Sequence, residues 1–203
     1  MALVKPRKPA EPIPETGGGD PLTRLEDADP ARRRAAVHAL EGRADAVPAL
    51  AGRLGREVDA SVREALLTAL VRTGDAAAAR SILPLLASED VGLRNGVIES
   101  LQQMPPAVVM PEAAPLLEAE DSDLRIFAVQ LVGRLPHPDR IPLLTAVLER
   151  DPEVNVCLAA VEALMETGRP DALPALEGLA LRFPDDPFVA FSVDAARRLF
   201  SGA

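Results

Sequence analysis

The chain has 203 residues, of which 48% are hydrophobic, and it contains neither Trp nor Tyr, a composition that disfavours a fold of aromatic and β-branched strands. Its net charge of −9 is uneven, because residues 88–203 carry nineteen acidic against nine basic groups. This half repels phosphate backbones and anionic lipid, so we expect neither nucleic acid nor a membrane as a partner. With a single Cys and no long apolar run, the sequence predicts a cytoplasmic protein without disulfides.

Residues 1–20 differ in composition from the rest of the chain. Four prolines fall within the first fourteen positions and favour extended backbone, and three consecutive glycines at 17–19 add a flexible hinge. We therefore expect a disordered Pro/Gly-rich tail over residues 1–20, followed by one folded domain over residues 21–203. A Pro-rich docking peptide around residues 5–9 is the alternative for the tail.

One stretch, residues 59–70 (D-A-S-V-R-E-A-L-L-T-A-L), shows the pattern on which the chain is built. Asp59 stands where a helix N-cap accepts bonds from free backbone N–H groups, and Val62, Leu66 and Leu70 form one apolar face. The same order of Asp, Arg and apolar face occurs in four places. The four arginines, spaced by 30, 31 and 31 residues, are Arg33, Arg63, Arg94 and Arg125. A period in this range predicts a solenoid of stacked repeats.

The apolar spacing and the prolines together predict pairs of helices from residue 21 onward. The second helices are expected at 30–41, 60–72, 91–104, 122–134, 152–167 and 187–200. The first helices are expected at 45–54, 75–87, 108–119, 139–149 and 170–182, after a short partial helix near 21–26. Prolines inside the first helices either start or bend them. Aligning the last two second helices by their final apolar residue places Cys157 and Ser192 at the arginine position.

The recurring pattern L-x-D-x-x-x-x-V-R-x-x-A-x-x-A-L resembles the HEAT repeat, in particular the short HEAT-like repeats of phycobilisome lyases. The resemblance implies an all-α fold, a right-handed α-solenoid of about five to six HEAT-like helix pairs over residues 21–203. In that family an Asp and an Arg six residues later form a ladder between neighbouring repeats. Asp27 with Arg33 is a full match, whereas Ser88 precedes Arg94 and Ala119 precedes Arg125. The ladder is therefore expected to be staggered.

Residues that could carry out chemistry are few and scattered. His38 and His137 have no thiol or carboxylate at a metal or catalytic spacing. Cys157 lies near an apolar face, where a small buried hydrophobe is the simpler interpretation. We therefore expect no catalytic residue, no metal and no cofactor, and a protein that is not an enzyme.

The outward side of the second helices is the candidate binding site, because these helices line one continuous concave surface in a solenoid. One row along it reads Arg34, Glu64, Asn95, Ile126, Leu158 and Val193, and it turns from polar to apolar. An exposed apolar run with a polar rim is typical of a protein contact patch. The predicted patch consists of Ile126, Phe127, Leu158, Val193, Glu99, Gln130 and Glu162. The alternative is that superhelical twist buries the apolar end of the row.

The aromatic residues gather near the C-terminus. Four of the five lie within the last helix pair, at Phe183, Phe188, Phe191 and Phe200. A terminal repeat lacks a neighbour, so we expect these rings to seal the end of the core. A docking surface at that end is the alternative.

These features predict a non-catalytic interaction scaffold or adaptor that binds a protein or peptide on the concave face. The acidic second half favours a partner with basic groups. A subunit of a bilin lyase, or of another chromophore-handling enzyme, is the alternative that the family resemblance implies. Nucleic-acid binding is a weaker alternative, because that role needs aromatic and basic residues on the concave face.

Overall fold

The computed structural model describes residues 19–201, so most of the predicted tail, residues 1–18, lies outside the described residues. Within that range every regular element is helical. The second helices are α2 (Pro30–Leu40), α4 (Ala60–Thr73), α6 (Val91–Gln103), α8 (Ser122–Arg134), α10 (Val154–Thr167) and α12 (Pro187–Ser201). The first helices are α1 (Pro21–Arg24), α3 (Val47–Leu54), α5 (Ala76–Ile82), α7 (Pro106–Ala113), α9 (Arg140–Arg150) and α11 (Leu173–Arg182). Four 3-10 turns accompany them: η1 (Ala44–Ala46), η2 (Leu83–Ala87), η3 (Ala114–Glu118) and η4 (Pro170–Ala172).

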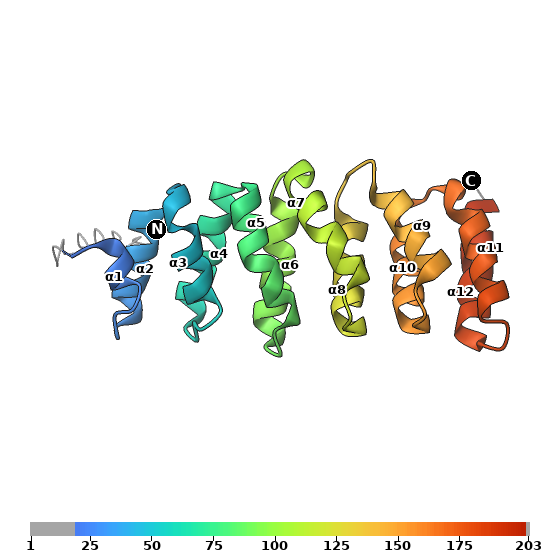
Figure 1. The fold of residues 1–203 in the computed structure, drawn as a ribbon, viewed down its shortest axis with the longest axis horizontal. Coiled ribbons are helices and arrows are strands. Elements are labelled where there is room, and N and C mark those ends of the chain that lie inside the picture. The colour runs from blue at the N-terminus through green and yellow to red at the C-terminus, as the bar shows by residue number, and fades with distance from the viewer. Residues whose placement is uncertain (1–18, 202–203) are drawn as a thin grey trace, which may run out of the picture.

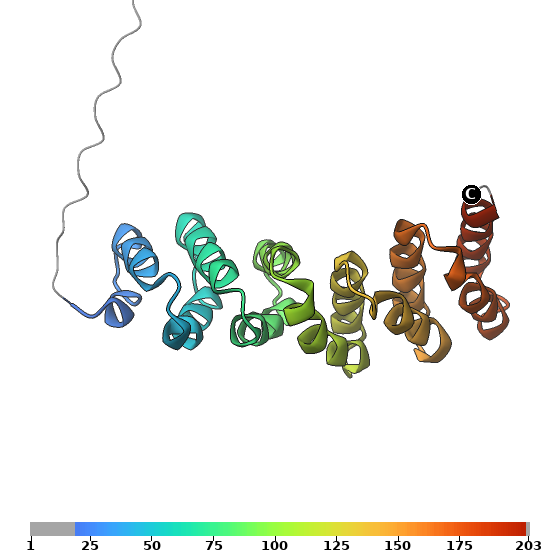
Figure 2. The same ribbon diagram turned by 90° about the horizontal axis from the view of Figure 1, so that it is seen from above.

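The helices stack as pairs into an elongated array. Figure 1 shows the pairs side by side in chain order, from α1 with α2 at one end to α11 with α12 at the other. In the view from above, the second helices occupy one side and the first helices the other, and the second helices lie on the inner side of a shallow curve (Figure 2). The predicted all-α solenoid is confirmed, and its helix bounds agree with the expected ones to within a few residues.

Local sequence explains where the second helices begin and end. The side chain of an N-cap aspartate accepts a backbone N–H at the start of five of them, and these caps are Asp29, Asp59, Asp90, Asp121 and Asp186. Gly74 and Gly168 end α4 and α10 with φ of 58° and 65°. Glycine adopts this left-handed conformation without the steric cost that a Cβ would add, so the chain can turn away there and end the helix.

Prolines shape the first helices in two ways. Pro48 and Pro174 stand at the second position of α3 and α11, where a missing N–H costs nothing. Pro84 and Pro115 stand at the second position of η2 and η3, where α5 and α7 give way to a tighter 3-10 turn. A proline cannot donate the helical hydrogen bond at these points, so α5 and α7 end there as α-helices and continue as 3-10 turns.

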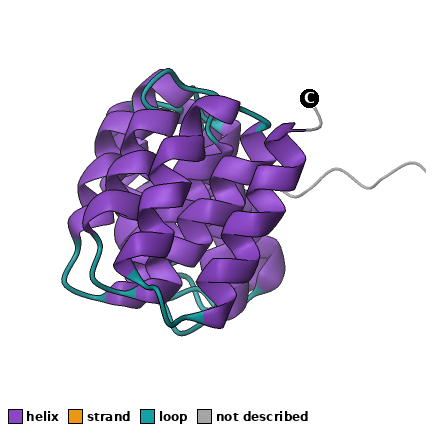
Figure 3. Ribbon diagram, turned by 90° about the vertical axis from the view of Figure 1, so that its right-hand side faces the viewer, coloured by secondary structure: helices purple, strands orange, loops and turns teal. Residues whose placement is uncertain are grey.

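One hydrophobic core runs through the whole array. In α4, the predicted apolar residues Val62, Leu66 and Leu70 are each completely buried. Equivalent positions in the other helices join the same continuous cluster. Viewed along the array, the helices form the body and the loops gather at two opposite edges (Figure 3). No helix between residues 19 and 201 combines the length and apolar character needed to cross a bilayer.

Close approach of α8 and α10 depends on Gly133. A Cβ built at this glycine would lie 2.6 Å from the Cβ of Ala163, far inside van der Waals contact. Alanine at Gly133 should therefore lower the free energy of unfolding, measured by urea titration, by about 1–3 kcal/mol, because two helix backbones must move apart. The control is Gly52→Ala in α3, where a Cβ meets nothing within 4 Å. That change should be neutral or stabilise by up to about 1 kcal/mol, and equal losses in both variants would contradict the close-packing argument.

Candidate protein-binding surface

Four second helices carry an arginine near their start, and each such arginine with the groups that it binds is called a rung below. Arg33 Nε and Nη2 donate to the two carboxylate oxygens of Glu57 in the next repeat, each at 2.8 Å. Its remaining donor binds the Asp27 carbonyl oxygen at 2.9 Å, six residues back in its own repeat. The ion pair is buried, because the exposed fractions of the two side chains are 7% and 0%. Arg33 is therefore joined to its own loop and to the following repeat.

The ladder is staggered, and the structure shows how. Arg125 repeats the first rung with Asp151, at 2.7 and 3.1 Å, and Arg63 binds Asp90 at 2.8 Å. Arg94 has Ala119 at the acid position of the next repeat, binds the Ser88 carbonyl oxygen of its own loop at 2.7 Å, and lies over the Phe127 ring, 4.4 Å from its centroid. Arg33 and Arg125 thus reach the acid at the ladder position of the next repeat, as the family's ladder implies, whereas Arg63 binds the N-cap acid of the next helix.

A substitute from another helix completes the rung at the fifth pair. Cys157 occupies the arginine position and is buried. The guanidinium of Arg182, in α11, donates to the Asp151 carbonyl oxygen at 2.6 Å and also to the Leu148 carbonyl oxygen. The Asp151 carbonyl lies six residues before position 157, the same separation as between Arg33 and the Asp27 carbonyl that it binds. The loop before α10 is therefore held as in the other repeats, without an arginine on α10 itself.

Acid should weaken the first rung through Glu57. Burial acts to raise the pKa of this carboxyl group, but hydrogen bonds from Arg33, the Asp59 N–H and Arg53 bring it down to about 2. Since the folded pKa is below the ordinary value of 4.5, ionised Glu57 contributes stability above that pH, and the contribution is lost as the pH falls toward 2. The loss is on the order of 3 kcal/mol.

Urea unfolding at several pH values measures this effect. Glu57→Gln cannot titrate, so its stability should fall less than that of the wild type on acidification. Glu64→Gln, at an exposed position of α4, is the control and should follow the wild type. Parallel pH profiles for wild type and Glu57→Gln would contradict the role assigned to this carboxylate.

The predicted apolar row is present on the second-helix face, but its last member is wrong. Ile126 and Leu158 are half-buried, five residues after the N-caps of α8 and α10, while Asn95 at the same place in α6 is exposed. Val193 is 1% exposed and belongs to the core. Phe191 takes the place in the row that had been assigned to Val193, and it is 74% exposed.

The error has a local cause at the start of the last two second helices. Both are preceded by Asp-Pro, but α10 has its N-cap at Glu153, two residues after Asp151. In the last helix Asp186 itself accepts the N–H groups of Phe188 and Val189, at 2.8 and 3.0 Å. Helix α12 therefore begins two residues earlier relative to the shared dipeptide. Alignment by the final apolar residue hides this shift.

With α12 in the register that the structure shows, an apolar groove lies between α10 and α12. Its volume is about 710 Å³, and its walls include Leu158, Ala159 and Met165 from α10 and Phe188, Phe191 and Ala195 from α12. Phe188 is 69% exposed, an unusual state for so large an apolar ring. The charged groups in this lining are the carboxylates of Glu162 and Glu166. The groove is thus apolar at its base and acidic along the α10 side.

The expectation that all four C-terminal rings seal the core holds for part of the set. Phe200 is buried and Phe183 is half-buried beneath the guanidinium of Arg182. Phe188 and Phe191 project away from the core, because α12 carries two apolar stripes. The inner stripe contains Val189, Val193, Ala196 and Phe200, and the outer stripe contains Phe188, Phe191, Ala195 and Leu199. The outer stripe is visible in the sequence, but the expectation that all four rings seal the end of the core did not take it into account.

The other predicted site residues are spread along the surface. Gln130 shares a smaller hollow between α8 and α10 with Glu162, and Glu99 lines a hollow between α4 and α6. Phe127 lies half-buried under Arg94, and Ile126 packs partly on the core. The structure therefore brings Leu158 and Glu162 into one groove and leaves the remaining members of the predicted patch outside it.

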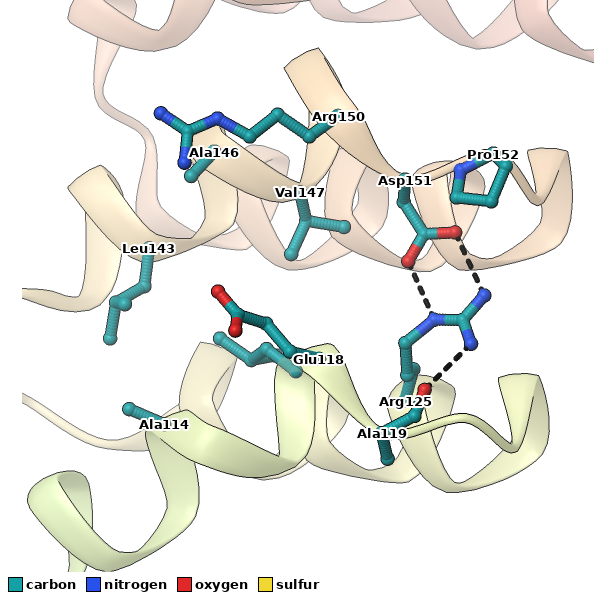
Figure 4. Close-up of a pocket in the computed structure, with 11 residues that line it drawn as sticks. Ala114, Glu118, Ala119, Arg125, Leu143, Ala146, Val147, Arg150, Asp151 and Pro152 are labelled. Atoms are coloured by element: carbon teal, nitrogen blue, oxygen red, sulfur yellow. Dashed lines mark hydrogen bonds and ion pairs between the residues drawn. The ribbon is translucent and has the colours of Figure 1, made fainter.

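A further hollow, of about 390 Å³, lies between η3 and α9 (Figure 4). Leu143, Ala146 and Val147 from α9 face Ala114 and Leu117 across it. Glu118 projects from one wall and Arg150 from the other, while the Arg125–Asp151 ion pair closes one end (Figure 4). Charges of both signs at its rim leave this hollow without a preferred partner charge.

Groups capable of chemistry are not gathered at any of the hollows described above. Within residues 19–201, no three His, Cys, Asp or Glu side chains are placed to hold a metal ion together. His38 Nδ1 lies 2.7 Å from a Glu41 carboxylate oxygen at an exposed site. Burial raises the pKa of the Cys157 thiol, so its nucleophilic thiolate form is disfavoured. The described surface thus offers shape and charge for binding.

Stacked helix pairs joined by arginine rungs define an α-solenoid, and comparison with known families identifies its kind. The chain belongs to the HEAT-repeat family, because the family model of HEAT repeats matches residues 20–102 and 110–194. No curated protein matches the chain.

Solved structures resemble the array at low sequence identity. A structure that concerns microtubule plus end tracking by XMAP215, CLIP-170 and EB1 is 14% identical, covers 88% of this chain and 89% of its own, and has a TM-score of 0.57. Human deoxyhypusine hydroxylase in complex with glycerol is 18% identical, with coverage of 90% and 84% and a TM-score of 0.46. The complex of CpcE and CpcF of phycocyanin lyase from Nostoc sp. PCC7120 is 18% identical, with coverage of 98% and 99% and a TM-score of 0.39. At 14% identity, the first likeness shows a shared fold and no more.

Proposed function

We propose that this protein is a non-catalytic, cytoplasmic interaction scaffold or adaptor that binds a protein or peptide partner on its second-helix face. The binding site would be the groove between α10 and α12. The single observation that carries the proposal is the exposure of Phe188 and Phe191, at 69% and 74%, beside a groove of about 710 Å³.

The physical argument rests on what such rings do at a surface. Apolar side chains gathered in a concave site release water when a partner covers them, at roughly 25 cal/mol per Å² of apolar area. Aromatic rings at the centre of an interface supply much of its binding energy, and a polar rim then excludes water. Leu158 and Met165 provide the apolar base, and Glu162 and Glu166 provide the rim.

Affinity capture from native lysate with a matched pair of variants tests the proposal. Phe191→Asp places a charge in the groove, whereas Leu181→Asp places the same charge on α11 at a residue that is 84% exposed and lies outside the groove lining. Wild type and Leu181→Asp should capture the same partner. Phe191→Asp should weaken capture by about 30-fold or more, which corresponds to about 2 kcal/mol.

The folded state of both variants is checked by circular dichroism. Equal capture by wild type, Leu181→Asp and Phe191→Asp would show that the partner binds elsewhere. Loss of capture by both variants would point to a general effect of added negative charge.

A further inference from the structure

We propose that the α10–α12 groove receives an amphipathic helix whose apolar face is flanked by Lys or Arg. The inference rests on the proposed function, since it names the partner chemistry of the same site. Two independent features of the groove carry it, namely the direction and composition of its walls and the sign of its charge.

The walls favour a helix as the occupant. The lining residues follow helical spacing on both sides, at 155, 158, 162 and 166 on α10 and at 188, 191 and 195 on α12. At a rise of about 1.5 Å per residue, the α10 wall extends for roughly 16 Å, or about three turns. Both walls are helices whose backbone groups are already hydrogen-bonded internally. An extended peptide would find no backbone partners there, whereas a helix satisfies its own.

The hollow between α10 and α12 is larger than the one between α8 and α10, at about 710 against 130 Å³. Between α8 and α10, Gly133 lies against Ala163 and the two helices close together. Between α10 and α12, the small residues Ala159 and Ala195 line the groove together with the exposed Phe191. A third helix can insert side chains over the alanines, in the way that ridges fill grooves between packed helices.

Charge selects the partner. The lining contains two carboxylates, Glu162 and Glu166, and neither Lys nor Arg. Both side chains are exposed, and the described structure shows no hydrogen bond or ion pair from either carboxylate. Arg134 lines the neighbouring hollow between α8 and α10 together with the same glutamates, without an ion pair to them. Basic side chains along the edge of an inserted helix would face these carboxylates, and acidic ones would be repelled.

Two synthetic helical peptides test this inference directly. Both carry leucine at the same amphipathic positions over about four turns, and their polar positions are all Lys in one and all Glu in the other. Binding of each labelled peptide to the full chain is followed by fluorescence anisotropy. The Lys peptide should bind at least about tenfold more tightly at low salt, and the difference should shrink as the ionic strength rises to about 0.5 M. Phe191→Asp should weaken binding of the Lys peptide relative to Leu181→Asp.

Charge reversal separates the groove from the general acidity of the chain. The double variant Glu162→Lys with Glu166→Lys should reverse the preference between the two peptides. The control, Glu89→Lys with Glu149→Lys, changes the net charge equally at exposed sites outside the groove and should keep the wild-type preference. Equal shifts in both double variants, or equal binding of the two peptides to the wild type, would overturn the inference.

The outcomes also separate this inference from the function on which it rests. If Phe191→Asp loses the captured cellular partner while the wild type binds both peptides equally, the groove is a binding site and the basic helix is wrong. If Phe191→Asp keeps the partner and the peptides show no preference, both proposals fail.

Discussion

Replacing Arg33 with alanine should lower the free energy of unfolding by about 3 kcal/mol, because a buried ion pair loses one partner. The guanidinium is the bidentate partner of Glu57 and also binds the carbonyl oxygens of Asp27 and Ala28. Glu57 would keep bonds from Arg53 and from two backbone N–H groups, which holds the loss near the lower end for a broken buried pair. Urea titration monitored by circular dichroism measures the change.

The adjacent residue provides a matched control. Arg32 is an arginine on the same helix, but its side chain is 61% exposed, and its contacts with Asp27 and Asp29 are 3.5 and 3.9 Å long. Exposed pairs of this kind contribute little, so Arg32→Ala should change the stability by no more than about 0.5 kcal/mol. Similar losses for Arg32→Ala and Arg33→Ala would refute a structural role for the rungs.

The fold could be predicted from the sequence because its signals are local. An N-cap aspartate, an apolar face and a C-terminal glycine lie within one helix, as in the stretch from Asp59 to Gly74. The period of the arginines then identified stacking before any contact was known. The family's ladder implied bonds between neighbouring repeats, and Arg33 with Glu57 follows it. It did not foresee that Arg63 binds Asp90 or that Arg182 binds a backbone carbonyl in place of a rung arginine, and a carbonyl leaves no mark in the sequence.

The candidate site depended on one register decision. The second-helix face and its change from polar to apolar followed from spacing, and Leu158 and Glu162 were placed in what is now a groove. Helix α12 was misaligned because its N-cap is the Asp of the Asp-Pro pair, whereas the N-cap of α10 lies two residues after that Asp. Burial then assigned Val193 to the core and Phe191 to the surface. A search of the sequence of α12 for a second apolar stripe would have found the outer stripe that contains Phe191.

Aspartate at Val193 should destabilise the C-terminal pair by more than about 4 kcal/mol, because the site is buried and offers a carboxylate no partner. Val193 is 1% exposed and packs within the continuous core that also holds Val189 and Ala196. A charge there would either remain unpaired or pull α12 away from α10. Thermal unfolding should therefore show a lower transition temperature, with reduced helical circular dichroism at room temperature.

Aspartate at Phe191, two residues earlier on the same helix, should cost about 1 kcal/mol or less, since an exposed ring is replaced on the outer stripe. The two variants carry the same new side chain, so their difference reports only the face of α12 on which it lies. Comparable losses would mean that the groove residues belong to the core, and a folded Val193→Asp with an unfolded Phe191→Asp would reverse the register. The expected order leaves Phe191→Asp folded, which is the condition under which its loss of a partner measures binding.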